Sequence, residues 1–407
     1  MCPDREKWSP LWVLKTLWEC IAGKLAVPVL YFAFMPAVQP SKAGAGHNTM
    51  TRREARRKRR MEKRTMKRNA FYNSFKFEDV ASMPALYAAA KDASKGVKWK
   101  ASVQKFLLNA LLNVWKLHHD LTAGRDVRRG FTEFDIWERG KKRHIRSLKF
   151  YERVAQKSIC TNALYPILTH GLVKENTSNR KGMGQKAAVD GIINDLRRHF
   201  RQYGNAGYII KADFKTYFDS INHDCLKDIH ARYVTDERTR RLAAGFIDAF
   251  GSVGLGLGSE TSQINATAYP NRLDHWIKEQ GRPDGFGRYM DDVFIFTRDL
   301  PEARRILDGI KRICEKLKIT LSEKKTRIVP FKDGIEWLKT RFSITGTGKI
   351  LKRPAPALIT RERRKLKRQK RILTPEELYK SFVSWSGCML RRNARRTVFN
   401  MRRLLED

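Results

Sequence analysis

The sequence predicts an α+β protein in which short antiparallel strands are interspersed with helices. Tyr208–Asp213 has the composition of a short buried strand, and the apolar run Val293–Phe296 follows a turn. The stretch between these strands is long enough for a helical unit and a return to the same sheet. Asp299–Glu302 then has the cap, proline and carboxylate of a helix start. The apolar face predicted for this helix consists of Ile306, Ile310, Ile313 and Leu317.

Three aspartates stand at the ends of these predicted strands. Asp291 and Asp292 are adjacent in the turn, where like charges repel and resist burial unless cations neutralise them. Asp213 ends the first strand, and its carboxylate lies beside those of Asp291 and Asp292 if the two strands are neighbours. Carboxylate oxygens suit Mg²⁺ or Mn²⁺ better than zinc, and a pair of such ions can drive an in-line nucleotidyl transfer. We therefore predict a catalytic site with two Mg²⁺ ions, Mn²⁺ being an alternative; a solvated turn is the other interpretation of the pair.

The motif Tyr289–Asp292 (Tyr-Met-Asp-Asp) between apolar strands resembles the catalytic signature of reverse transcriptases. Asp213, with the aromatic Phe218 five places on, resembles the first catalytic aspartate and the sugar gate of that family. The resemblance covers roughly Phe131 to Met401. It implies a right-hand polymerase fold with fingers, a palm with an antiparallel sheet, and a helical thumb. It also implies RNA-directed DNA synthesis from an RNA template, a DNA or RNA primer and dNTPs.

The segment Gly254–Gln263 narrows the resemblance. Its Leu-Gly-x-x-x-Ser-Gln string is typical of the reverse transcriptases of diversity-generating retroelements and of related bacterial and phage enzymes. Gly256 stands where proline is usual, and Leu257 stands where glutamine would contact the incoming nucleotide, which implies an error-prone enzyme. Without the family, the glycines would indicate only a flexible loop. The nucleotide-binding residues implied in the palm are Phe214, Phe218, Leu257, Gly258 and Gln263.

Upstream, the basic segment Lys141–Gln156 resembles the fingers segment that grips the triphosphate. A triphosphate must be held by fixed cations, and arginine binds phosphate with bidentate geometry. Arg143 and Arg153 are the candidates, with Arg146 in reserve. The alternative is a hairpin with an exposed basic turn that runs into an amphipathic helix. Arg180, in a basic loop punctuated by glycine, resembles a residue that holds the template backbone.

Downstream, the segment Leu317–Thr326 resembles the motif whose lysine approaches the leaving pyrophosphate. Lys325 is the candidate for general-acid or electrostatic assistance, and a surface lysine is the alternative because Lys324 is adjacent. Relatives usually have Phe-Leu-Gly before a hairpin that supports the primer, and here Lys339 replaces the glycine. The template- and primer-binding residues implied by the resemblance are Arg180, Tyr289, Met290 and Lys339.

Composition independently indicates a nucleic-acid partner. Lys and Arg number 83 against 42 Asp and Glu, a net charge of +41 over 407 residues. Self-repulsion of this size is tolerated mainly where a polyanion neutralises it. The cysteines and histidines show no metal-ligand or disulfide spacing, so we expect reduced cysteines. We expect RNA, primer and dNTPs as partners, no membrane, and a bacterial or phage-encoded protein of the cytoplasm. An accessory protein or a dedicated noncoding RNA is a further candidate partner.

The pattern along the chain predicts five segments. Residues 1–49 are an apolar extension whose proline-interrupted run is shorter than a membrane span, and we expect it to be dispensable, with Met50 as the start. Residues 50–70 form a basic arm, expected to be solvated and poorly ordered or to lie on RNA. The remaining segments are N-terminal helices and fingers (71–205), a palm with the catalytic aspartates (206–343) and a helical basic thumb (344–407).

Two further patterns predict helices. Phe106–Leu107, Ala110–Leu111 and Val114–Trp115 recur at helical spacing and predict a packing stripe. Thr374–Glu377 has a threonine cap, a proline at the first helical position and two carboxylates that meet the helix dipole. We expect a thumb helix to start there, with the neighbouring basic run Arg361–Arg368 following a duplex backbone.

Two alternative functions remain. Within the enzyme class, the chain would be an antiphage-defence or retron-like reverse transcriptase that copies a dedicated noncoding RNA, and the neighbouring genes would distinguish this from a diversity-generating element. From another class, it would be a non-catalytic RNA-binding subunit with a fossil active site. The intact trio of Asp213, Asp291 and Asp292 argues against this second alternative.

Overall fold

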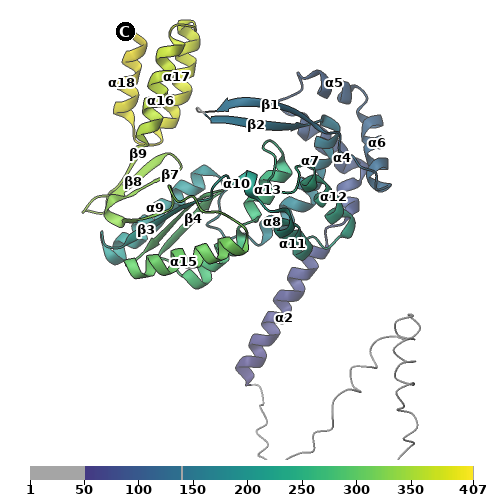
Figure 1. Ribbon diagram of the computed structural model, residues 1–407, viewed down its shortest axis with the longest axis horizontal. Helices are drawn as coiled ribbons and strands as arrows, with labels where there is room; N and C mark the ends of the chain where they lie inside the picture. Colours follow the sequence, from purple (N-terminus) through teal and green to yellow (C-terminus); the bar gives the residue numbers. More distant parts are fainter. Residues whose placement is uncertain (1–50, 139–140, 407) are drawn as a thin grey trace, which may run out of the picture. The chain divides into compact units, whose positions relative to one another are not determined.

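Helices and antiparallel sheets alternate along the chain, in agreement with the predicted α+β class (Figure 1). The computed structural model describes residues 51–138 and 141–406. It divides into two compact units, and the boundary follows Lys63, within the first described helix. The second unit, from Arg64 onward, contains every sheet and every predicted site residue. The prediction that residues 1–49 are dispensable falls outside the described residues.

The basic segment that was expected to be poorly ordered forms helix α2 (Arg52–Asn73). The Thr51 backbone N–H donates to the Glu54 carboxylate at 2.8 Å, and the Glu54 N–H donates to the Thr51 hydroxyl at 3.2 Å. This reciprocal cap satisfies two donors at the helix start. Arginine, lysine, glutamate and methionine are also good helix formers. The expectation of disorder was therefore wrong, because it weighed charge repulsion without capping and helix propensity.

Four helices follow α2, and they carry the predicted packing stripe only in part. They are α3 (Phe77–Ala81), α4 (Met83–Ser94), α5 (Ala101–Leu108) and α6 (Ala110–Thr122). Phe106 and Val114 are buried as expected, but Leu111 and Trp115 are 68% and 52% exposed. The helix breaks at Asn109, whose φ and ψ of −116° and 43° are not helical. The break rotates α6 relative to the register predicted for a continuous helix.

A two-stranded hairpin and a group of helices make up the predicted fingers. Strands β1 (Phe131–Glu138) and β2 (Lys141–Leu148) pair antiparallel, and β2 runs into α7 (Phe150–Ile159). This arrangement has the hairpin and helix of the alternative interpretation, and triphosphate binding by the segment stays a prediction. The chain continues through the π-helical turn η3 (Cys160–Leu164), α8 (Tyr165–His170) and α9 (Gln185–Tyr203).

A four-stranded antiparallel sheet forms the predicted palm, in the order β4-β5-β3-β6. Its strands are β3 (Tyr208–Asp213), β4 (Gly285–Tyr289), β5 (Asp292–Thr297) and β6 (Arg327–Pro330). Successive side chains of a strand point to opposite faces. Ile210 and Val293 accordingly pack into one apolar core, and Ile209 and Phe294 pack into another. The prediction that β3 and β5 are neighbours is confirmed.

Helices from different parts of the chain cover the two faces of this sheet (Figure 1). Helix α15 (Leu300–Lys316) shares a core with Ile210, whereas Ile192 and Leu196 of α9 share the opposite core with Phe294. The predicted apolar face of α15 is confirmed, since Ile306, Ile310, Ile313 and Leu317 all belong to the Ile210 cluster. The helices between β3 and β4 are α10 (Tyr217–Ser220), α11 (His223–Tyr233), α12 (Glu237–Asp248), α13 (Glu260–Ala268), α14 (Asn271–Trp276) and the π-helical turn η4 (Ile277–Gly281).

A second small sheet precedes the C-terminal helices. After the 3-10 turn η5 (Phe331–Asp333), its strands are β7 (Ile335–Trp337), β8 (Thr340–Ile344) and β9 (Ile350–Pro354). Strand β8 crosses the boundary predicted at residue 344, so the helical part begins later, with α16 (Pro356–Gln369). It continues with α17 (Pro375–Leu390) and α18 (Arg395–Glu406). The predicted boundary between palm and thumb was too early, because the sequence of the short strand β9 does not show the pattern expected of a strand.

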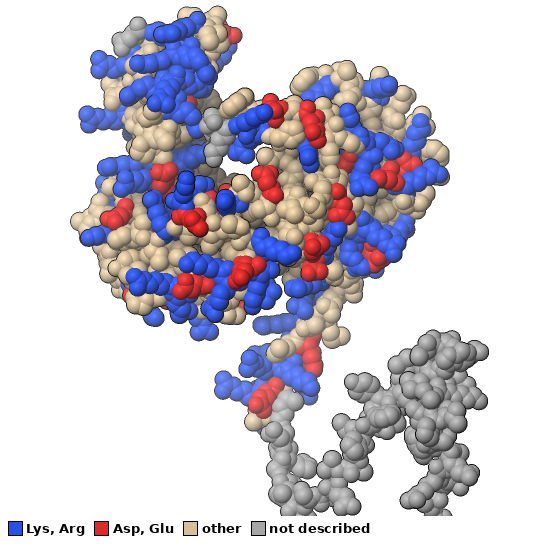
Figure 2. Space-filling view, in the orientation of Figure 1, with Lys and Arg blue, Asp and Glu red and all other residues tan. Residues whose placement is uncertain are grey.

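The C-terminal helices pack on one another and carry many cations. Leu366, Phe382 and Met401, one from each helix, are buried in a common apolar cluster. The predicted start of α17 is confirmed by a capping box between Thr374 and Glu377. Figure 2 shows Lys and Arg side chains crowded over these helices. Within the described part of the chain, no helix is both long enough and apolar enough to span a membrane.

A largely buried carboxylate ties helix α9 to strand β4 and predicts a pH effect on stability. The Asp195 carboxylate accepts the Phe286 backbone N–H at 3.2 Å and pairs with Arg198 at 2.6 Å. Burial raises the pKa of Asp195 from 3.8 to about 6. The folded protein then binds more protons than the unfolded chain between these values, so the free energy of unfolding falls as pH rises through this window.

We predict that Asp195→Asn reduces this fall, because asparagine keeps an acceptor for Phe286 without a buried charge. Urea denaturation at several pH values between about 4 and 7 measures the difference between variant and parent. Asp190→Asn, which removes an exposed carboxylate from the same helix, is the matched control. An unchanged pH dependence in Asp195→Asn would rule out this carboxylate as its source.

Candidate active site

The three predicted aspartates meet at one end of the palm sheet. Asp213 pairs directly with Asp292 across β3 and β5, and Tyr289 pairs with Asp292 across β4 and β5. Met290 and Asp291 therefore form a two-residue turn, and Met290 has a φ of 56°, in the left-handed region that tight hairpins require. The backbone N–H of Phe214 donates to the Asp291 carbonyl at 3.3 Å. The turn is thus tied to the strand that carries the third aspartate.

The electrostatics of this strand end favour a cation. Burial raises the pKa of Asp291, and the charge of Asp213 raises it further, while Lys325 and Arg143 oppose the rise. Burial and the neighbouring Asp291 raise the pKa of Asp292 to about 6. Carboxylates that raise each other's pKa in this way are stabilised as anions when positive charge is brought to them.

Lys325 supplies one such charge. Its ammonium lies 2.7 Å from Asp213 Oδ2, and this hydrogen bond raises the pKa of Lys325. The backbone holds the lysine there, because the Ser322 N–H donates to the Asp213 carbonyl at 2.7 Å and the Lys325 N–H donates to the Ser322 carbonyl at 3.1 Å. Lys325 therefore contacts Asp213, and its role at the leaving pyrophosphate stays a prediction. The lysine side chain is 56% exposed, so it borders the carboxylates without sealing them off.

The fit of a metal ion can be tested on these donors. Across residues 51–138 and 141–406, no three His, Cys, Asp or Glu side chains are grouped closely enough to enclose a metal ion. The donor chemistry nevertheless fits, because three carboxylates at one strand end are hard oxygen ligands of the kind Mg²⁺ and Mn²⁺ prefer. One carboxylate oxygen of Asp213 is engaged by Lys325, which a cation would have to share or displace. The binding of two ions stays a prediction.

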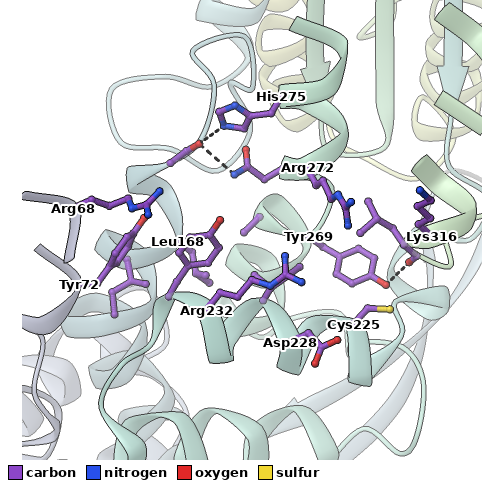
Figure 3. Close-up of a pocket in the computed structure, with 17 residues that line it drawn as sticks. Arg68, Tyr72, Leu168, Cys225, Asp228, Arg232, Tyr269, Arg272, His275 and Lys316 are labelled. Atoms are coloured by element: carbon purple, nitrogen blue, oxygen red, sulfur yellow. Dashed lines mark hydrogen bonds between the residues drawn. The ribbon is translucent and has the colours of Figure 1, made fainter. Parts of the chain in front are cut away.

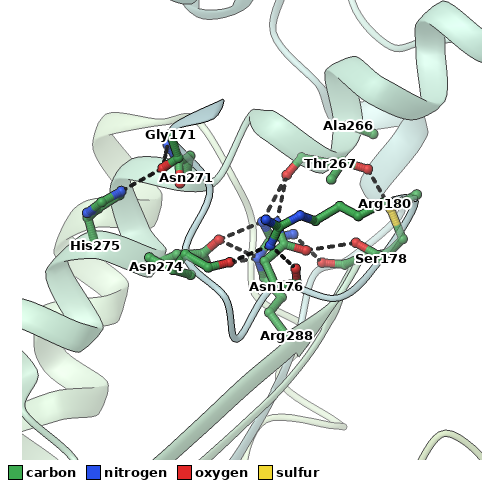
Figure 4. A network of polar contacts seen from close by, with 12 residues as sticks. Gly171, Asn176, Ser178, Arg180, Ala266, Thr267, Asn271, Asp274, His275 and Arg288 are labelled. Carbon is green, nitrogen blue, oxygen red and sulfur yellow. Dashed lines mark hydrogen bonds and ion pairs between the residues drawn. The ribbon is translucent and has the colours of Figure 1, made fainter. Parts of the chain in front are cut away.

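A buried ion pair fixes the turn, and sequence reasoning missed it (Figure 4). Arg288 and Asp274 have fully buried side chains. Arg288 Nε and Nη2 each donate to the Asp274 carboxylate at 2.7 Å. The same guanidinium donates to the carbonyls of Met290 and Thr267, both at 2.9 Å. Arg288 thereby holds the Met290–Asp291 turn, the end of α13 and helix α14 together. In the sequence, an arginine within a strand expected to be buried was the one sign that such a pair exists.

The loop before α9 is attached to the same strand. The Thr177 N–H donates to the Arg288 carbonyl at 3.3 Å, and the Arg288 N–H donates to the Glu175 carbonyl at 3.1 Å. Arg180, predicted to hold the template backbone, donates from one guanidinium nitrogen to the carbonyls of Val173 and Asn176 at 2.8 and 2.9 Å. Much of its hydrogen-bonding capacity therefore stabilises this loop, and template contact by Arg180 stays a prediction.

A cavity of about 790 Å³ brings together many of the predicted contacts. Its lining includes Arg180, Phe218, Leu257, Gln263, Tyr289 and Met290. These residues come from a loop, α10, the glycine-rich segment, α13, the end of β4 and the Met290–Asp291 turn, so the fold assembles them from distant positions. Cavities of this size and mixed polarity are typical of sites for nucleotide-sized ligands.

Of the three predicted fingers arginines, only Arg153 lines a smaller cavity, which adjoins the larger one. Arg153 and Gly258 line a space of about 200 Å³, and Arg153 donates to the Ser147 hydroxyl at 3.2 Å. Arg143 lies on the exposed strand β2, and its charge acts on Asp291. Arg146, the reserve candidate, pairs with Glu133 at 3.2 Å. Arg153 therefore lies beside the larger cavity, which Phe218, Leu257 and Gln263 line, and does not itself line it.

Two palm predictions are modified by burial and close packing. Phe214 is only 2% exposed and packs in the core, so the structure leaves almost none of its surface for the predicted nucleotide contact. A Cβ added at Gly256 would lie 2.0 Å from the Phe250 ring, which explains a glycine where proline is usual. Sequence position alone does not distinguish a core aromatic residue from one that lines a site.

The hairpin expected to support the primer is retained despite Lys339. The β7–β8 turn consists of Leu338 and Lys339, with φ values of 47° and 61°. Glycine and asparagine are favoured in such positions, so two ordinary side chains here carry some strain. The Lys339 side chain is exposed, and its contact with a primer stays a prediction.

Comparison with known proteins identifies the family. Residues 135–342 match the family described as reverse transcriptase (RNA-dependent DNA polymerase). The match covers half of the chain, and the chain belongs to the reverse transcriptase family. The family consists of RNA-directed DNA polymerases, which are nucleotidyltransferases, in agreement with the predicted enzyme class, and the match supports a right-hand polymerase-like fold.

Other comparisons add little. None of the curated proteins matches the sequence. Among solved structures, apo telomerase from Candida tropicalis, truncated from the C-terminal domain, is 14% identical with a TM-score of 0.43. The alignment covers 55% of this chain and 54% of that chain, so this chain spans about half the length of the telomerase structure.

The buried ion pair predicts a large stability effect. We expect Arg288→Met to lower the free energy of unfolding by about 3–5 kcal/mol, because it leaves Asp274 as a buried, unpaired charge. Urea denaturation measures the change. Lys380→Met, which breaks an exposed pair with Glu376, is the matched control and should cost less than about 1 kcal/mol. Equal effects of the two substitutions would show that the Arg288 pair does not hold the turn.

Proposed function

We propose that this chain copies RNA into DNA by adding dNTPs to a primer at the site formed by Asp213, Asp291 and Asp292. The observation that carries the proposal is the direct pairing of Asp213 with Asp292, with Asp291 in the adjoining turn. This pairing joins two parts of the chain that the sequence singled out separately. Family membership supports the same reaction class.

The proposed reaction assigns a task to each group. Mg²⁺ bound by the three carboxylates would supply the positive charge that activates the primer 3′-oxygen and stabilises the leaving pyrophosphate. Lys325 would neutralise the departing phosphate oxygen or give it a proton, and its hydrogen bond to Asp213 supports this assignment. Arg143 and Arg153 would hold the triphosphate through charge-assisted hydrogen bonds.

Selection of the substrate would take place in the larger cavity. Phe218, half-buried on α10, would pack against the sugar and leave no room for a 2′-hydroxyl. Leu257 offers an apolar side chain where a polar contact to the nucleotide is usual in the family, so discrimination between bases would be weak. RNA template, primer and dNTPs are the proposed partners.

We place the enzyme in a diversity-generating retroelement of a bacterium or phage, acting in the cytoplasm. The support is the glycine-rich segment from Gly254 to Gln263, whose Leu257 favours error-prone copying. An antiphage or retron-like enzyme is the alternative, because its reaction would use the same site. Sequencing of the RNA and cDNA that copurify with the protein distinguishes them: mutated copies of a repeat region indicate diversification, and faithful copies of one structured RNA indicate the alternative.

The proposed reaction predicts the effect of removing the carboxylates. Asp291→Ala or Asp292→Ala should lower primer extension on an RNA template by about a thousandfold or more, because several kcal/mol of transition-state stabilisation are lost. RNA binding should stay close to that of the parent. Asp308→Ala, at an exposed carboxylate on α15, is the control and should extend primers normally.

Two outcomes would contradict the proposal. Full extension by either site variant would remove the carboxylates from catalysis. A parent protein that binds RNA but extends no primer with Mg²⁺ or Mn²⁺ would favour the non-catalytic RNA-binding subunit.

The proposed role of Phe218 predicts a change in sugar selection. Phe218→Ala should increase ribonucleotide incorporation relative to dNTPs by roughly 10- to 200-fold, the range expected for one steric contact. Competing single-nucleotide incorporation measures the ratio. Leu257→Ala, in the same cavity, is the control and should leave sugar selection unchanged. An unaltered ratio in Phe218→Ala would exclude Phe218 as the sugar gate.

A further inference from the structure

A second cavity of about 770 Å³ lies at the other end of helix α13 from the predicted nucleotide cavity (Figure 3). Gln263 and Ile264, in the first half of this helix, line the nucleotide cavity. Ala268 and Tyr269, at its far end, line the second cavity, and the two cavities share no lining residue. None of the predicted catalytic or nucleotide-binding residues reaches the second cavity, so its chemistry needs a separate explanation.

Four cationic side chains from four helices converge on this cavity. They are Arg68 of α2, Arg232 of α11, Arg272 of α14 and Lys316 of α15. In the part of the chain that the structure describes, none of the four has a hydrogen-bond or ion-pair partner on its side chain. Asp228 is the one carboxylate among the described lining residues, so the cavity is net positive. Unneutralised cations held around one hollow are an anion-binding arrangement.

Part of the remaining lining is apolar, and part is polar, with Asn271 and His275. Leu168 and Ile229 contribute apolar surface, and the Tyr72 and Tyr233 rings lie 5.3 Å apart. The Tyr269 hydroxyl donates to the Leu317 carbonyl at 2.5 Å, which fixes the wall between α13 and the end of α15. A cavity of this size with an apolar wall and a cationic rim suits a phosphate group attached to an organic body.

We propose that this cavity binds a nucleotide unit of single-stranded RNA outside the polymerase site, with its phosphates on Arg232 and Arg272. The shared chemistry of RNA and of a free nucleotide is the phosphate. We choose RNA because Arg64 and Lys67 precede Arg68 on α2 and extend the positive charge beyond what one free nucleotide needs. The choice of RNA over other polyanions rests on the proposed function. The pocket would anchor template RNA at a distance from the catalytic turn.

The test compares the double variant Arg232→Ala/Arg272→Ala with the parent in binding to labelled poly(U). Salt dependence is the sharpest measurement, because each phosphate contact to a single strand contributes about 0.7 to the slope of log K against log salt concentration. We expect weaker binding and a slope reduced by about 1.4. Arg197→Ala/Arg304→Ala, which removes two exposed arginines outside the cavity, is the matched control and should change the slope less.

Two further measurements separate the outcomes. Extension of a short primer–template should stay at the parent's level in Arg232→Ala/Arg272→Ala. A parent protein that extends no primer would refute the proposed function but would leave the poly(U)-binding result unaffected. Calorimetric titration with ATP distinguishes the free nucleotide: loss of ATP binding in the double variant with an unchanged poly(U) slope would overturn the RNA proposal.

The unmodified chain provides an independent test if the variants fold poorly. The Cys225 thiol lines the cavity and is partly exposed. We expect saturating poly(U) to slow the alkylation of Cys225 by iodoacetamide. Mass spectrometry of the peptide that contains Cys225 measures the rate. Alkylation at the same rate with and without poly(U) would show that RNA does not enter the cavity.

Discussion

The buried pair of Arg288 and Asp274 is the interaction on which the geometry of the candidate active site depends. Two charges removed from water are tolerated only when they are paired and their remaining donors and acceptors are satisfied. The Arg288 guanidinium meets this condition by contacting Asp274 and the carbonyls of Met290 and Thr267. Since Met290 lies in the turn with Asp291, the cost of leaving the arginine unpaired keeps the turn in one conformation.

That rigidity supports a cluster of carboxylates that would otherwise repel one another. Asp213 and Asp292 are directly paired across two strands, and burial raises the pKa of both Asp291 and Asp292. Such an arrangement lowers the stability of the fold in the absence of positive charge. Lys325, which pairs with Asp213, offsets only part of the repulsion between the carboxylates. Proteins keep strained electrostatics of this kind where function requires it.

The large excess of cations is divided between two roles. Some arginines are parts of the framework: Arg288 is fully buried, Arg180 donates to loop carbonyls and Arg146 pairs with Glu133. Others, such as Arg232 and Arg272, face a cavity with no partner in the described part of the chain. Only the second kind retains the full hydrogen-bonding capacity that phosphate recognition uses. The net charge of the sequence therefore overstates the surface available to nucleic acid.

The sequence by itself determined the family and the α+β class, because motif spacing and strand alternation are local properties. It also indicated the two strands that carry the aspartates, and the fold then paired the strand that ends in Asp213 with the strand that begins at Asp292. It also determined the start of α17, where a capping box acts within one turn. Tertiary structure alone decided that the Phe214 ring enters the core, that Arg180 is engaged by its own loop, and that Arg288 finds Asp274. These outcomes depend on which side chains from distant segments are buried together, and desolvation of a charge or a ring is a property of the assembled fold that no short stretch of sequence contains.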